Sequence, residues 1–176
     1  MNKFIYILPI VICLTLVYMD FSKSLNNANS RLISKPVPKF ELLAFSENKH
    51  SNDVVKSQEL PDEPMIINIF ASWCPTCIIE HPQLMDLADK HGVTIYGIAY
   101  QDTMDGLSKM LTQRGNPYEK IAVAPQIYNF NPWDLRGTPE SYILDAKGII
   151  RYHHQGPISQ EHVETIILPL LEELEP

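Results

Sequence analysis

The chain has 176 residues, of which 45% are hydrophobic and 20% are charged, and its formal net charge at pH 7 is −7. This length allows one ordinary domain plus a short appendage, and the composition excludes a disordered chain. An acidic chain without basic clusters also argues against nucleic acid as a partner.

The N-terminus carries the most hydrophobic stretch. Residues 4–19 form sixteen positions without a charged side chain, close to the ~20 that span a bilayer as a helix. The polar residues that follow offer a poor cleavage site, which favours a retained anchor over a cleaved signal peptide. We therefore predict a membrane anchor at residues 1–20, a linker rich in Ser and Asn at 21–36 and a folded domain at 37–176.

The first half of the domain alternates strand and helix patterns. Residues 40–43 and 65–70 have the length and apolar composition of strands, and the polar residues between them are predicted as a loop. A helix is predicted from Pro75, which suits a first helical turn, to Gly92. Residues 93–100 then form a second buried strand.

The second half continues this alternation and ends in a different unit. A helix capped by Asp102 or Thr103 is predicted to end at Gly115. After an irregular stretch, a hairpin is predicted within residues 141–153 and an amphipathic helix over residues 159–174. Strand–helix–strand units followed by a hairpin indicate an α/β fold with a central mixed sheet flanked by helices.

A CxxC pair, Cys74 and Cys77, stands between the strand at 65–70 and the next helix, which is the thioredoxin-like arrangement. The remaining cysteine, Cys13, falls in the predicted anchor, so no disulfide framework is present, and a bridge across so short a loop stabilises little. Thiol–disulfide exchange needs one thiolate and a second thiol nearby. Because a helix N-terminus stabilises an anion, we predict Cys74 as the nucleophile and Cys77 as the resolving thiol, with no cofactor required.

A metal site is the main alternative to a redox pair. Cys74, Cys77 and His81 have the spacing of three ligands, with Cys77 and His81 on one helical face. A structural zinc site needs a fourth ligand, and no second CxxC exists, but copper held by two sulfurs and a histidine stays open. Ile78 stands where a c-type haem attachment motif needs histidine. The redox interpretation is favoured over copper delivery and over a redox-silent interaction module.

Other residues are predicted to surround the pair. Trp73 is expected at the rim of the site, while Pro75 and Thr76 stiffen the turn between the cysteines. Pro139 precedes a strand and is a candidate cis-proline facing the thiols, where the Thr138 backbone would pair with an extended polypeptide. The alternative is an ordinary loop proline at the start of a strand.

Two acidic residues belong to the same candidate site. If Glu80 or Glu140 approaches the thiols, it disfavours the thiolate and pushes the couple toward a reductant. The alternative for each is a solvated carboxylate.

Five stretches together resemble the membrane-anchored, thioredoxin-like proteins of cytochrome c maturation, the CcmG or DsbE family. They are FASWCPTCIIEHPQL (70–84), IYGIAYQD (95–102), GNPY (115–118), GTPESYILDAKG (137–148) and IRYHHQGP (150–157). The resemblance implies a single-pass protein of the inner membrane whose domain faces the periplasm. It further implies reduction of the haem-binding cysteines of apocytochrome c and re-reduction by a membrane dithiol donor.

The resemblance also places the CxxC pair, the cis-proline, Glu80 and Glu140 in the active-site region. Residues 124–132 and 134–137 depart from the family pattern, which alters the expected wall of the substrate groove. A membrane-tethered thiol reductant with another substrate, including one that serves copper-site assembly, is therefore the nearest alternative.

Overall fold

The computed structural model describes residues 30–46 and 52–175. The predicted anchor at residues 1–20 and most of the predicted linker lie outside these ranges. Within the described ranges, no helix has the length and apolar character that a membrane span requires.

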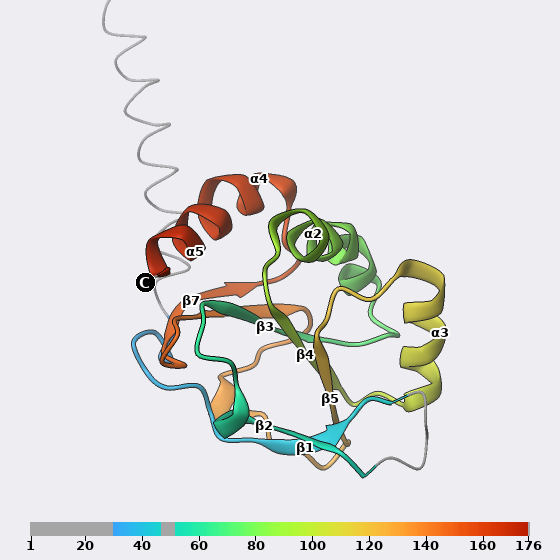
Figure 1. Ribbon diagram of the computed structural model, residues 1–176. Coiled ribbons are helices and arrows are strands. Elements are labelled where there is room, and N and C mark those ends of the chain that lie inside the picture. The colour runs from blue at the N-terminus through green and yellow to red at the C-terminus, as the bar shows by residue number, and fades with distance from the viewer. Residues whose placement is uncertain (1–29, 47–51, 176) are drawn as a thin grey trace, which may run out of the picture.

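A seven-stranded mixed sheet forms the centre of the domain, with the strand order β2-β1-β5-β4-β3-β6-β7 (Figure 1). β3 pairs in parallel with β4, and β4 with β5, whereas β6 runs antiparallel to both β3 and β7. This arrangement confirms the predicted thioredoxin-like mixed sheet. The strands are β1 (Glu41–Ala44), β2 (Val54–Lys56), β3 (Met65–Phe70), β4 (Ile95–Tyr100), β5 (Lys120–Ala124), β6 (Glu140–Leu144) and β7 (Ile150–Gln155).

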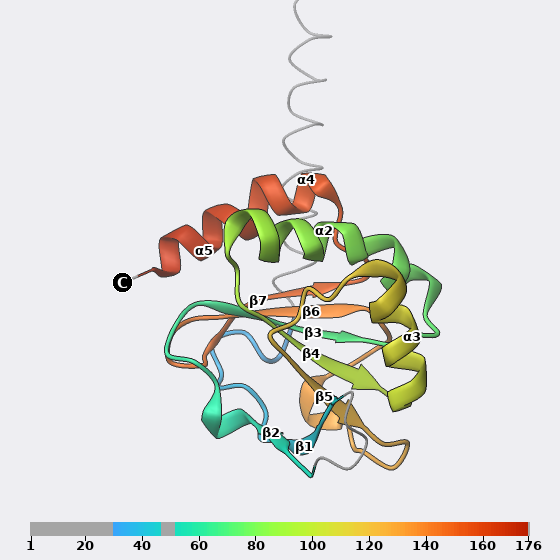
Figure 2. The same ribbon diagram turned by 45° about the vertical axis from the view of Figure 1, so that its right-hand side comes forward.

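The helices gather over one face of the sheet, as Figure 2 shows for α2 and the C-terminal helical segment. They are α2 (Pro75–His91), α3 (Met104–Arg114) and the C-terminal run of α4 (Gln160–His162), the π-helical turn η3 (Val163–Ile167) and α5 (Leu168–Leu174). Their apolar side chains share one buried cluster with Ile66 and Phe70 of β3. Because strand side chains alternate, Ile67 and Ile69 enter a second cluster on the opposite face.

The second cluster is closed by irregular chain instead of a regular helix. Trp133 in the short 3-10 helix η2 (Asn131–Trp133) is fully buried there, 5.8 Å from the ring of Phe40 and 5.3 Å from that of Tyr142. The segment before β6 is therefore held against the sheet by buried aromatic rings.

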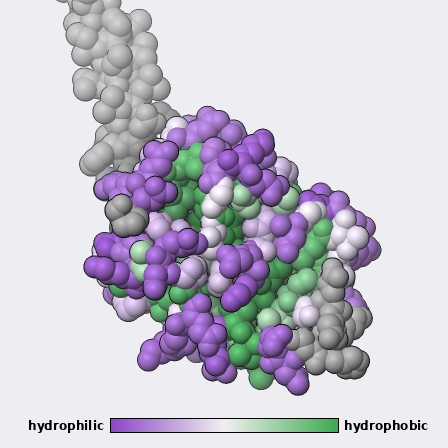
Figure 3. All heavy atoms as spheres, in the orientation of Figure 1, coloured by the Kyte–Doolittle hydropathy of each residue, from purple (hydrophilic) through white to green (hydrophobic). Residues whose placement is uncertain are grey.

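On the face seen in Figure 3, polar side chains cover most of the domain and hydrophobic residues show between them.

The elements nearest the site are confirmed as predicted. β3 is buried at all six positions, as a strand covered on both faces must be. α2 begins at Pro75 and ends at His91, and its C-cap Gly92 has a φ of 65°, the left-handed conformation that favours glycine. Thr103 caps α3 by accepting a hydrogen bond from the Gly106 N–H.

Two strands fall where no strand is predicted. β2 and the following 3-10 helix η1 (Ser57–Glu59) occupy the predicted loop, and β5 occupies the predicted irregular stretch. β5 contains two alanines and only five residues, so its own strand propensity is weak. Its position between β4 and β1 supplies the hydrogen bonds that define it.

The described end of the predicted linker contacts the domain. The Ser34 N–H donates to the Ile150 carbonyl at 2.8 Å, and the Ile150 N–H donates to the Lys35 carbonyl at 2.9 Å. Arg31 forms an ion pair with Asp134. Contacts with the domain therefore start before the predicted boundary at residue 37.

Candidate active site

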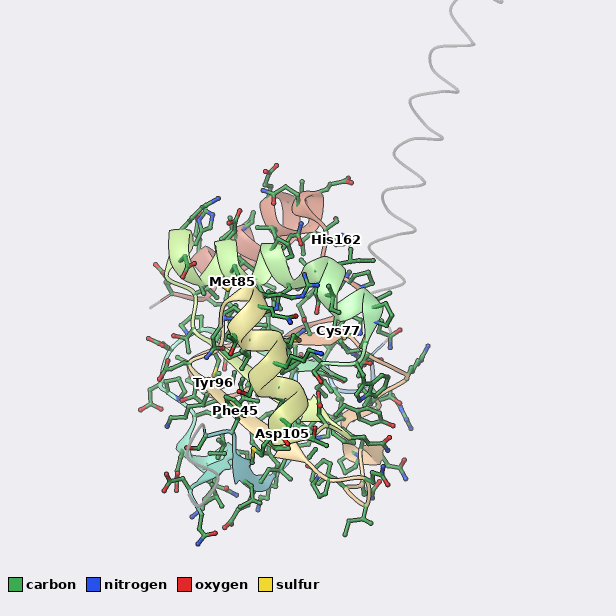
Figure 4. The ribbon with its side chains drawn as sticks, turned by 90° about the vertical axis from the view of Figure 1, so that its right-hand side faces the viewer. Phe45, Cys77, Met85, Tyr96, Asp105 and His162 are labelled. Carbon is green, nitrogen blue, oxygen red and sulfur yellow. The ribbon has the colours of Figure 1, made fainter. Side chains whose placement is uncertain are left out.

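Cys74 and Cys77 lie together at the N-terminus of α2, and Figure 4 shows Cys77 on this helix. Cys74 is the N-cap, and its Sγ accepts a hydrogen bond from the Cys77 N–H at 3.3 Å. The Thr76 Oγ1 lies 3.2 Å from the same sulfur. Both cysteines are free thiols and only 4% exposed, so a substrate disulfide must approach closely to react.

The surroundings push the two thiols toward different protonation states. Burial opposes ionisation of Cys74, but hydrogen bonds from the Cys77 thiol, the Thr76 hydroxyl and the Cys77 N–H outweigh it, so the pKa of Cys74 lies below its ordinary value. Burial raises the pKa of Cys77, and its hydrogen bond to Cys74 and the charge of Glu80 add to this effect. Cys74 is therefore the thiol that ionises first.

The loop before β6 faces the nucleophile. The Thr138–Pro139 peptide bond is cis, the isomer that the sequence predicts. The Cys74 thiol donates to the Thr138 carbonyl at 3.5 Å, and the Thr76 hydroxyl lies 3.4 Å from the same oxygen. Thr76 and Thr138 thus both contact the reactive sulfur.

Glu80 is a fully buried acid one turn after Cys77 on α2. Its Oε1 accepts a hydrogen bond from Asn68 Nδ2 at 2.9 Å, and its Oε2 accepts one from the Ile158 N–H at 2.8 Å. Burial raises the pKa of Glu80 to about 7, against the lowering effect of these two donors. The alternative of a solvated carboxylate is wrong for this residue.

The partners of Glu80 form a buried polar network that the sequence analysis missed. Asn68 stands in the middle of β3, where it also donates to Ser141 Oγ at 3.0 Å. The Tyr118 hydroxyl donates to Asn68 Oδ1 at 2.9 Å. The available signal was an amide inside the apolar run MIINIF, because a buried polar side chain requires buried partners.

Glu140 is also buried, 2% exposed, but its contacts go to the loop instead of to a thiol. Its Oε1 accepts hydrogen bonds from the N–H groups of Arg136 at 2.8 Å and Gly137 at 3.2 Å. Its Oε2 lies 2.8 Å from Nε2 of His153 on β7. Glu140 therefore fixes the chain that leads into the cis-proline, and the solvated alternative is wrong here too.

His81 is turned toward α3. Its Nε2 forms a hydrogen bond with the Gly115 carbonyl at 3.2 Å, and burial lowers its pKa. Across residues 30–46 and 52–175, no three His, Cys, Asp or Glu side chains converge as metal ligands would. The arrangement therefore gives no support to the copper site of Cys74, Cys77 and His81.

A groove of about 430 Å³ opens beside the nucleophile. Trp73 forms part of its wall, 57% exposed, with Nε1 donating to the Gln101 carbonyl at 3.3 Å, which agrees with the predicted rim position. The remaining wall is aromatic and polar and comes from the end of β4 and from the chain between β5 and β6. These residues are Tyr100, Tyr128, Asn129, Phe130, Asn131, Leu135, Arg136, Gly137 and Thr138.

Comparisons with known proteins point to the same chemistry. Residues 33–167 match the Redoxin family. The chain is 35% identical over 182 residues to the thiol:disulfide interchange protein DsbE of Pasteurella multocida, covering 99% of this chain and 98% of that protein. It is 32% identical over 189 residues to DsbE of Vibrio cholerae serotype O1, covering 99% and 97%.

Solved structures share the fold. A thiol:disulfide interchange protein of Chlorobium tepidum is similar with a TM-score of 0.62 and 25% identity, covering 81% of this chain and 99% of that one. A secreted thiol-disulfide isomerase from Corynebacterium glutamicum is similar with a TM-score of 0.64 and 17% identity, covering 77% and 85%. The second likeness concerns the fold alone.

Proposed function

The chain belongs to the Redoxin family and, within it, to the DsbE thiol:disulfide interchange proteins, and from this premise we propose that it works as a reductase of protein disulfides. It is a thiol:disulfide oxidoreductase that acts on a protein disulfide. The observation that carries the proposed mechanism is the opposite effect of the site on its two thiols, which lowers the pKa of Cys74 and raises that of Cys77.

The reaction proceeds by two exchange steps. The Cys74 thiolate attacks one sulfur of the substrate disulfide, which forms a mixed disulfide and releases the other substrate sulfur as a thiolate that takes up a proton. Cys77 then loses its proton and attacks the Cys74 sulfur, which releases the second substrate thiol and leaves a Cys74–Cys77 disulfide. The substrate gains two electrons and two protons. The pair loses two electrons and the Cys77 proton, water supplies the other proton, and no cofactor enters.

Glu80 serves the second step. Cys77 must lose a proton although burial disfavours its thiolate, and a buried carboxylate with a pKa of about 7 is suited to accept a proton near neutral pH. The same carboxylate disfavours a lasting negative charge at Cys77. A raised pKa leaves Cys77 protonated at neutral pH, as an ordinary thiol is, so it changes the stability of the reduced pair little, whereas the lowered pKa of Cys74 stabilises that pair. The reductase direction is therefore proposed from the resemblance to the cytochrome c maturation proteins and not from these two shifts.

The substrate that fits this proposal is apocytochrome c with a disulfide between its haem-binding cysteines. Support comes from the resemblance to the cytochrome c maturation proteins. It also comes from the groove beside Cys74, which can hold the substrate polypeptide on either side of the attacked disulfide. In this proposal the domain faces the periplasm from an inner-membrane anchor at residues 1–20, and a membrane dithiol donor re-reduces the pair. A tethered reductant with a different protein substrate is the alternative.

The rates at which two disulfide peptides are reduced test the proposed substrate. The full chain, purified in detergent and reduced, is mixed with a peptide that carries an intramolecular CxxCH disulfide or with the same peptide in which alanine replaces the histidine. We expect the CxxCH peptide to be reduced about tenfold faster, as one well-placed contact would provide. Equal rates for the two peptides would contradict the cytochrome assignment, and reduction of neither peptide would contradict the reductase itself.

A further inference from the structure

A buried histidine stands behind the loop that faces Cys74. His153 on β7 is 1% exposed, and its ring stacks on Tyr142 of β6 with ring centroids 4.2 Å apart. Its Nε2 lies 2.8 Å from Glu140 Oε2. The exchange mechanism described above does not use this residue.

The contacts of Glu140 and His153 define which atom donates and which accepts. Glu140 Oε1 accepts two backbone hydrogen bonds, from Arg136 and Gly137, so Oε2 is the oxygen that faces His153. His153 Nδ1 is buried and, among the described residues, has no hydrogen-bond partner. A proton on Nδ1 would have no acceptor there, so a proton on Nε2, donated to Glu140, is favoured.

His153 is the donor to Glu140 Oε2 that has no competing acceptor among the contacts described. The Tyr142 hydroxyl lies 3.1 Å from the same oxygen but only 2.8 Å from the Trp133 carbonyl, and it has one proton to donate. When that proton goes to Trp133, only His153 holds this side of the carboxylate. The orientation of the carboxylate therefore depends on the histidine.

We propose that His153 is a positioning residue for disulfide exchange. It holds Glu140, Glu140 holds the Arg136–Gly137 backbone, and this backbone places the Thr138 carbonyl against the Cys74 sulfur. The inference deepens the proposed function and rests on it, because the same loop edge is where an extended substrate would pair. Loss of the His153 contact then weakens substrate binding more than it slows the chemical step.

Two substitutions at one position test this proposal. In His153→Gln the side-chain amide can replace the Nε2 donor, whereas in His153→Asn the shorter amide cannot reach Glu140. For reduction of a disulfide peptide by the full chain, we expect His153→Asn to raise KM about tenfold with kcat within about threefold, and His153→Gln to stay within about threefold in both, as loss of one hydrogen bond to a charged group implies. Equal behaviour of the two variants would overturn the proposal, because a merely structural role would not distinguish them.

Nitrogen NMR of the histidine ring provides a readout that needs neither substrate nor a substitution at position 153. We expect the wild-type chain at pH 7 to carry the His153 proton on Nε2. In Glu140→Gln the amide nitrogen would face the ring, so the proton should move to Nδ1. A proton on Nδ1 alone in the wild type would leave Nε2 without a hydrogen to donate to Glu140 and would overturn the inference. Failure of the proposed function itself would be seen separately, as disulfide-exchange activity that persists in Cys74→Ser.

Discussion

Replacing Cys74 by serine is expected to lower the rate of disulfide exchange by roughly a thousandfold or more, because a hydroxyl stays protonated at neutral pH whereas the thiolate is the attacking group. Replacing Cys77 by serine should instead let the first step occur and block the second. The Cys77→Ser chain should then accumulate as a covalent adduct with its substrate, visible on a non-reducing gel and removed by dithiothreitol.

The remaining cysteine offers a matched control for this pair of variants. Cys13→Ser changes a thiol in the predicted anchor and should leave the exchange rate unchanged. Full exchange activity in Cys74→Ser would contradict the assignment of Cys74 as the nucleophile. A redox-silent interaction module would instead show no disulfide exchange in the wild-type chain. An adduct that forms through Cys77 in Cys74→Ser, with none in Cys77→Ser, would reverse the assigned roles.

Replacing Glu80 by glutamine is expected to change how stability depends on pH. The pKa of Glu80 is raised to about 7 from an ordinary 4.5, so between these pH values the folded chain keeps a proton that the unfolded chain releases. The free energy of unfolding therefore falls as pH rises through this window, by about 3 kcal/mol in total. In Glu80→Gln this contribution should vanish. The free energy of unfolding of the variant, taken relative to that of the wild type, should therefore rise as pH increases through this window.

Urea unfolding at several pH values between 4 and 8 measures this effect, and the slope is more telling than the absolute stability. The amide also loses one acceptor toward Asn68 or Ile158, which lowers stability at every pH. Glu172→Gln, at an exposed position of α5, is the control and should follow the wild-type curve. Parallel curves for wild type and Glu80→Gln would show that Glu80 ionises normally in the folded chain.

Glu80→Gln should also slow the release of the reduced substrate from the mixed disulfide. Without a buried base, the mixed disulfide at Cys74 should resolve about a hundredfold more slowly, as loss of a general base implies. Quenched-flow separation of the mixed disulfide checks this rate, and the first step should keep its rate. An unchanged resolution rate would remove Glu80 from the proton transfer and leave its electrostatic effect on Cys77 intact.

The sequence predicted the part of the fold that local chemistry defines. β3, the start of α2 at Pro75 and its C-cap at Gly92 follow from an apolar run, a proline at the first turn and a glycine that adopts a left-handed φ. β5 could not be predicted in the same way, because its five residues become a strand only through pairing with β4 and β1.

The candidate site shows the same division. The two cysteines, Trp73 and the cis-proline could be located from short motifs, whereas the partners of Glu80 and the histidine partner of Glu140 come from other elements of the fold. Ile158 supplies a donor to Glu80 from 78 positions away, and His153 reaches Glu140 across the β6–β7 register. The metal interpretation of His81 depended on helical spacing alone, and that spacing does not reveal that the ring turns toward Gly115.

The reduction potential of the Cys74–Cys77 pair tests the central claim most directly. The full chain is equilibrated in dithiothreitol buffers of known potential, and alkylation followed by mass spectrometry gives the fraction reduced. A reductase predicts a value near or below that of thioredoxin, about −270 mV, whereas a value near the −120 mV of a strong disulfide donor would contradict it. The second result would keep the fold and the cysteine pair and make the protein an oxidant of its substrates.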